Sequence, residues 1–160
     1  MCGEVNKRMR NLDAMEGRLF LSDEELNRSI GLIFSAHQRF MAATQYARST
    51  AGLSLPAFNL LSGIHANPGI TVKDLRADMA MTIPSFARLL GELDRRGLIE
   101  KKVSPQDARR RKLFPSAAGK ALLAPIEAIM RDVLRPAFQA AGAENVRGLR
   151  HVLKALAEAL

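Results

Sequence analysis

The feature that most constrains the fold is a cluster of positive charge between Arg95 and Lys112. This segment holds eight Lys or Arg residues against two acids, a net of +6 out of +8 for the whole chain of 160 residues. Within it, two β-prone runs, Leu98–Val103 and Arg111–Phe114, flank a turn that contains a proline, which is the pattern of a β-hairpin. The charge is therefore concentrated on one predicted hairpin, and such a surface favours a polyanionic partner.

Helical signals occupy the chain before the hairpin, and each begins with a residue suited to capping a helix N-terminus. We expect a long helix to about Ser49, a second to about Asn67, a short third helix and a fourth that ends at Gly97, because glycine suits the residue after a helix. The predicted caps are Ser22, Ser54, Thr71 and Thr82. Phe86, Leu89, Leu90 and Leu93 form the predicted buried stripe of the fourth helix.

Two further helices are predicted after the hairpin. Apolar spacing indicates one over roughly 116–139, and Pro125 and Pro136 should each kink or interrupt it, since proline lacks the N–H and clashes with the preceding turn. Ala141-Gly142 should break the chain before a final helix. With Ala and Leu abundant, the fold class is mainly α with one small hairpin.

The composition excludes several classes of function. Cys2 is the single cysteine, so an intrachain disulfide is impossible, and the three histidines lack the spacing of metal ligands. No nucleophile–base set appears, so we expect neither an enzyme nor a metal or cofactor. No apolar run approaches the roughly 20 residues of a membrane-spanning helix, and the N-terminus lacks the apolar core of a signal peptide, which predicts a cytoplasmic protein.

Residues 71–96 have the layout of a helix-turn-helix: a short helix, a tight turn and a longer helix with polar residues at its start. Followed by a basic hairpin, this layout predicts a winged helix-turn-helix that binds double-stranded DNA. The second helix would lie in the major groove, where Arg88 suits guanine O6 and N7, although a lone exposed arginine is more often an ordinary surface residue. The predicted DNA-binding residues of this helix are Thr82, Pro84, Ser85, Ala87 and Arg88. Those of the wing, for phosphate and minor-groove contacts, are Arg109, Arg110, Arg111 and Lys112.

The segment from Leu55 to about Leu123 resembles the MarR family of bacterial transcription regulators. The matching pieces are Asn67–Val72 before Asp74-Leu75, Ser85–Leu90, Leu93–Ile99, the wing motif Asp107-Ala108-Arg109, and Pro115–Gly119 where the family usually has Leu-Thr-x-x-Gly. Each piece is short, but their order and spacing are specific. One departure is Gly91, which stands where many members have Asp, and a mid-helix glycine makes close packing plausible there.

This resemblance implies a homodimer in which the first and last helices pair across a two-fold axis. It also implies that Arg109 enters the minor groove and that Asp107 helps to hold it there. The first and last predicted helices each carry an apolar stripe, and one small lobe cannot bury both. Pairing of two chains would bury them, which agrees with a homodimer on a pseudo-palindromic site. The residues of these stripes are Leu26, Ile30, Ile33, Val146, Leu149, Leu153, Leu156 and Leu160.

The expected organisation is a partly ordered arm, residues 1–20, and a single winged-helix domain, residues 21–160. Within that domain, 54–115 would be the DNA-binding lobe, and 22–49 with 116–160 would be the dimerisation helices.

Many relatives in this family bind small phenolic or aromatic acids, so the resemblance implies a regulator, most often a repressor, that such a ligand releases from DNA. The candidate pocket residues are His37, Tyr46, Arg48 and His65. For each, an ordinary surface or hydrogen-bonded core role is the simpler interpretation. The alternative function is a ligand-independent winged-helix module for DNA architecture or protein interaction, although the wing tip lacks the aromatic residues that protein interfaces favour.

Overall fold

The computed structural model describes residues 22–77, 79, 81–104 and 107–159, and the side chains of residues 104 and 107–110 lie outside the described part. The chain forms two compact units, Met1–Ala42 and Ala43–Leu160. The division falls within the first described helix, α2 (Asp23–Thr50). The expected arm, residues 1–20, and Cys2 lie outside the described residues.

Helix α2 begins where its sequence predicts. The backbone N–H of Glu25 donates to the Ser22 hydroxyl over 3.3 Å, and Asp23, Glu24 and Glu25 occupy the first turn. Carboxylates at the N-terminus of a helix interact favourably with the positive end of the helix dipole. The helix ends at Thr50, one residue beyond the expected boundary, and Gly52 follows with a φ of 62°.

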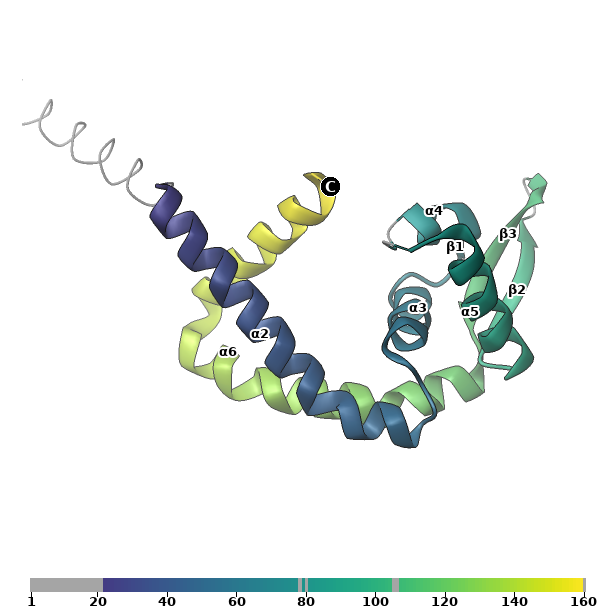
Figure 1. Ribbon diagram of the computed structural model, residues 1–160, viewed down its shortest axis with the longest axis horizontal. Helices are drawn as coiled ribbons and strands as arrows, with labels where there is room; N and C mark the ends of the chain where they lie inside the picture. The colour runs from purple at the N-terminus through teal and green to yellow at the C-terminus, as the bar shows by residue number, and fades with distance from the viewer. Residues whose placement is uncertain (1–21, 78, 80, 105–106, 160) are drawn as a thin grey trace, which may run out of the picture. The chain divides into compact units, whose positions relative to one another are not determined.

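Three helices follow in the second unit: α3 (Leu55–Ala66), α4 (Val72–Ala77) and α5 (Ile83–Arg95). Of these, α4 and α5 form the predicted helix-turn-helix. Figure 1 shows these three helices gathered beside a small sheet. The core between them is apolar, because every residue of the predicted α5 stripe is buried and packs with buried side chains of α3 and α4. Those of α3 and α4 are Ala57, Phe58, Leu60, Leu61, Ile64 and Leu75.

The end of α5 is closed by a Schellman motif. Gly97 has a φ of 67°, its N–H donates to the carbonyl of Asp94, and the N–H of Leu98 donates to the carbonyl of Leu93 over 2.9 Å. Glycine adopts this backbone region without steric cost. The predicted stop at Gly97 is confirmed, and the chain turns there into the first strand of the hairpin.

The sheet has three antiparallel strands in the order β1-β3-β2. Strands β2 (Ile99–Ser104) and β3 (Asp107–Pro115) form the predicted hairpin, which we call the wing. The short strand β1 (Ile70–Thr71) pairs with Leu113 and Lys112 of β3 and was not predicted. Strand β3 also begins four residues earlier than expected, at Asp107, which pairs across the turn with Ser104.

The last helix, α6 (Ala117–Ala159), is continuous except at Gly142, whose φ of 78° and ψ of 162° are non-helical. The break predicted at Ala141-Gly142 is therefore confirmed. An interruption at Pro125 or Pro136 is wrong, since both prolines lie inside the helix with helical angles, whereas a kink at either site stays a prediction. Proline removes one hydrogen bond to the carbonyl four residues earlier, and at both sites that carbonyl belongs to an exposed residue that water can reach.

Two capping expectations had different outcomes. Thr71 and Asp74 interact as a capping box should, with the Asp74 N–H donating to the Thr71 hydroxyl and that hydroxyl donating to the Asp74 carboxylate over 2.7 Å. Thr82 does occupy the N-cap position of α5, but its side chain makes no capping bond to the backbone. Its hydroxyl instead donates to the Ser85 hydroxyl over 3.0 Å.

The close packing expected at Gly91 is also absent. A Cβ atom built there meets no heavy atom within 4 Å. Gly91 faces the less buried side of α5, so an alanine would fit without displacing a neighbour.

Candidate nucleic-acid interface

Helix α5 separates its apolar and polar residues into two faces. Its apolar stripe is buried, whereas all five residues predicted to contact DNA are exposed. The structure therefore places Thr82, Pro84, Ser85, Ala87 and Arg88 together on the open surface of the first two turns. Such a surface can enter a groove without any change in the core.

The wing supplies the positive charge beside α5. Arg111 is exposed and Lys112 is half-buried. Both belong to the central strand β3, where Lys112 lies opposite Thr71 of β1 and Lys102 of β2. The backbone of Asp107, Arg109 and Arg110 is also in β3, but the side chains of these three predicted residues lie outside the described part of the chain.

Two lysines of β2, Lys101 and Lys102, interact with neighbouring side chains at the base of the wing. Lys101 Nζ lies 2.7 Å from Asp94 Oδ2, which joins β2 to the last turn of α5. Lys102 Nζ lies 5.0 Å from the centroid of the Phe114 ring and 3.1 Å from Glu100 Oε2. These cations therefore have intramolecular partners, in contrast to Arg111, which has no ion pair with a described residue.

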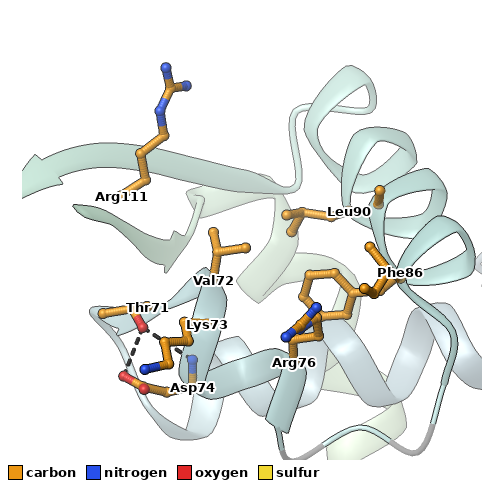
Figure 2. A pocket seen from close by; sticks show the side chains of 10 residues that line it. Thr71, Val72, Lys73, Asp74, Arg76, Phe86, Leu90 and Arg111 are labelled. Atoms are coloured by element: carbon orange, nitrogen blue, oxygen red, sulfur yellow. Dashed lines mark hydrogen bonds between the residues drawn. The ribbon is translucent and has the colours of Figure 1, made fainter. Parts of the chain in front are cut away.

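A hollow of about 590 Å³ lies between α4, α5 and the wing. Figure 2 shows Val72, Phe86 and Leu90 facing this hollow, with Arg111 extending outward from β3. Its lining is apolar at the floor and charged at the rim. The lining residues are Thr71, Val72, Lys73, Asp74, Arg76, Ile83, Phe86, Ala87, Leu90 and Arg111.

Three of these lining residues were missed by sequence reasoning. Lys73 and Arg76 are exposed on α4, and they add two cations to those of the wing. Ile83, at the first position of α5, leaves 63% of its surface exposed. The sequence did contain an indication of this exposure. Ile83 lies between the N-cap Thr82 and Pro84, at the first position of the helix, where an apolar side chain can contact little of the core.

The four candidate ligand residues have separate surroundings. Arg48 is buried, donates from Nε to Thr44 Oγ1 over 3.2 Å and lies 5.8 Å from the centroid of the Phe58 ring. His65 Nδ1 lies 3.5 Å from Glu127 Oε1 of α6. Tyr46 is 83% exposed, and His37 is exposed in the other compact unit. The described contacts thus link neither Arg48 nor His65 to the other candidates.

The predicted dimerisation residues are mostly exposed in the single chain. Leu26, Ile30 and Ile33 of α2 are 44–53% exposed, and Leu149, Leu153 and Leu156 of α6 are 44–51% exposed. Val146 is buried, and Leu160 lies outside the described residues.

Within the described ranges, no three side chains of His, Cys, Asp or Glu are grouped so that they could hold a metal ion. No described helix is both long and apolar enough to cross a membrane.

Comparisons with known proteins agree with this geometry. The model of the MarR family matches residues 51–110. The HTH-type transcriptional regulator PetP of Rhodobacter capsulatus is 32% identical over 141 residues, which is 88% of this chain and 85% of PetP. The protein is thus a winged-helix, DNA-binding transcriptional regulator, and it belongs to the MarR family.

Solved structures show the same fold at lower identity. NadR in complex with 4-hydroxyphenylacetate has a TM-score of 0.71 at 23% identity, covering 80% of this chain and 90% of NadR. A mutant MepR from a multidrug-resistant S. aureus clinical isolate has a TM-score of 0.69 at 20% identity, covering 82% of this chain and 97% of MepR.

Proposed function

We propose that this regulator binds a pseudo-palindromic operator as a homodimer, represses transcription and is released from DNA by a small aromatic or phenolic acid. The observation that carries the DNA-binding step is the hollow between α4, α5 and the wing. It brings the first turns of α5 beside Arg111, Lys73 and Arg76. A major-groove helix and a set of phosphate-binding cations thereby share one surface.

Each part of this surface has a distinct role in the proposal. Ser85 and Arg88 contact base edges, and Arg88 is suited to a bidentate bond with guanine. Arg109, Arg110, Arg111 and Lys112 contact phosphates and the minor groove, with Asp107 orienting Arg109. Because the α5 core is complete without the exposed face, these contacts require no refolding of the lobe.

Dimerisation is supported by the exposed apolar residues of α2 and of the C-terminal part of α6. Soluble monomers rarely leave large apolar patches in contact with water. Pairing with a second copy would cover both surfaces. It would also place two recognition helices about 34 Å apart, one turn of DNA.

Ligand release is supported by Arg48 and by the solved relative NadR, which was crystallised with 4-hydroxyphenylacetate. Arg48 is a buried cation near the end of α2, and a guanidinium is the group that best matches a carboxylate. His65, beside Glu127 of α6, offers a second polar group at the joint between α3 and α6. A ligand can release DNA only if it binds the DNA-free state more tightly.

Selection of duplexes from a random pool by the purified protein tests the DNA-binding step. We expect an enriched sequence with two related half-sites and an affinity that falls steeply as salt rises, because phosphate contacts release counterions. Recovery of unrelated sequences with equal affinity would support the architectural alternative instead.

A second experiment tests ligand release on the selected operator. We expect 4-hydroxyphenylacetate to raise the melting temperature and release DNA. Phenylacetate, which lacks the phenol hydroxyl, and 4-hydroxyphenylethanol, in which an uncharged alcohol replaces the carboxylate, should act more weakly. His65→Gln should reduce release, whereas His151→Gln, at an exposed position of α6, should not. If no such compound acts at millimolar concentration, the protein binds DNA without this class of ligand.

A further inference from the structure

Ile83, the first residue of α5, is a large apolar side chain on the exposed side of the helix, whereas the other large apolar side chains of α5 are buried. Ile83 continues the row formed by Phe86 and Leu90, yet those two residues are at most 8% exposed and Ile83 is 63% exposed. Ala87 lies one turn further along, is also exposed, and lines the same hollow. The first two turns of α5 therefore present an apolar surface to solvent beside Ser85 and Arg88.

The charges around this apolar surface indicate what it contacts. Lys73, Arg76 and Arg111 line the same hollow, and none forms an ion pair with a described residue. Among the described lining residues the single carboxylate is that of Asp74, which is hydrogen-bonded to Thr71. An apolar patch rimmed by three cations and one engaged carboxylate is complementary to an anionic partner that carries its own apolar groups.

Double-stranded DNA has one such group in the major groove, the C5-methyl of thymine, which apolar side chains contact. We propose that Ile83, supported by Ala87, is a specificity-determining residue that packs against a thymine methyl group in each half-site. Lys73, Arg76 and Arg111 would meet the flanking phosphates. This inference rests on the proposed function, because it requires α5 to lie in the major groove.

The replacement of single thymines by deoxyuridine in the selected operator tests the inference directly, since it removes the methyl group and leaves base pairing intact. We expect one thymine per half-site to be sensitive, with affinity falling about fourfold, which corresponds to about 0.8 kcal/mol for one buried methyl group. The other thymines should tolerate the change. A wild-type protein that binds the operator with no sensitive thymine overturns the inference and leaves the proposed function intact.

A variant at position 83 assigns that sensitivity to its side chain. With Ile83→Ala, the thymine operator should bind more weakly, and the ratio of thymine to deoxyuridine affinity should fall to about one, as a double-mutant cycle requires for contacting groups. Ile83→Val should reduce the ratio partially, so a folded intermediate variant is available if the alanine variant unfolds. A ratio that stays at its wild-type value in both variants overturns the inference.

Leu55 provides a matched control. It is the first residue of α3, is followed by a proline as Ile83 is, and is 36% exposed, but it does not line the hollow. Leu55→Ala should keep the wild-type ratio. If Ile83→Ala instead alters release by 4-hydroxyphenylacetate and keeps the ratio, the hollow holds the small molecule and the inference is wrong. Failure to bind any duplex would refute the proposed function itself.

Discussion

Arg96 donates from Nη1 to the carbonyl oxygen of Gly52 over 2.8 Å, and this bond joins the end of α5 to the end of α2. Its second terminal nitrogen, Nη2, donates to the carbonyl of Ala51 over 2.9 Å. The chain leaves the helix after Thr50, so the carbonyls of Ala51 and Gly52 have no helical partner, and a guanidinium fork can satisfy both at once. Arg96 therefore fastens the recognition helix to the corner between α2 and α3.

The first prediction follows from this contact. Arg96→Ala should lower the free energy of unfolding by about 1 kcal/mol, because hydrogen bonds from charged donors contribute about 1.5–3 kcal/mol and partial exposure weakens them. Arg96→Lys should lose much of the same energy, since one ammonium cannot reproduce the fork. Urea unfolding measures both. Arg95→Ala, at the adjacent exposed position, should stay within about 0.5 kcal/mol of wild type.

Two glycines should respond to alanine in opposite directions. A Cβ atom on Gly119 would overlap the carbonyl oxygen of Leu98, whereas one on Gly91 would have open space. Gly119→Ala should therefore cost about 1–3 kcal/mol through backbone displacement, and Gly91→Ala should stabilise by roughly 0.5–1 kcal/mol through helix propensity. Thermal melting of the two variants checks this, and equal shifts would contradict the packing at the start of α6.

Removal of a wing arginine should weaken DNA binding without unfolding the protein. Arg109→Ala should reduce operator affinity. It should also lower the magnitude of the slope of log affinity against log salt concentration by about 1, which is the effect of one lost phosphate contact. Anisotropy titrations at several salt concentrations measure both quantities. Lys154→Ala removes the same charge from the exposed end of α6 and should change neither. Unchanged affinity for Arg109→Ala would show that the wing does not contact DNA there.

Arg88 should determine which base pairs the protein prefers, rather than its overall affinity for DNA. Arg88→Ala should relax selection at one or two base pairs per half-site, at a cost of about 1–3 kcal/mol for a lost bidentate contact. Sequencing of pools selected by wild type and variant compares the positions. A uniform loss at every position would mean that Arg88 binds phosphate.

The exposed stripe of α6 should be needed for assembly. Leu149→Glu combined with Leu153→Glu should give a monomer that binds a single half-site weakly, because charges would replace apolar contacts at the two-fold interface. Deletion of residues 143–160 should give a monomer or an aggregate. Sedimentation at micromolar concentration detects both, with Lys154→Glu as the control. A double variant that sediments as a dimer would place the interface elsewhere.

The helices and the wing could be predicted from the amino-acid sequence, because their signals are local. Ser22, Ser54 and Thr71 cap helices through bonds that span three residues, and Gly97 ends α5 through its own φ. The α5 stripe and the basic hairpin are likewise contained in short windows. For the same reason, the family could be identified from the order of short motifs along the chain.

The contacts between residues far apart in the sequence could not be predicted in this way, because they depend on the packing of the folded chain. Strand β1 has only two residues, too few for a strand pattern in the sequence. It forms because Ile70 and Thr71 pair with Leu113 and Lys112 of β3. Arg96 donates a hydrogen bond to Gly52, which is forty-four residues away in the sequence. The hollow that joins Ile83 to the cations of α4 and β3 has the same origin. Such contacts depend on how elements pack in three dimensions, and spacing along the chain carries no record of that packing.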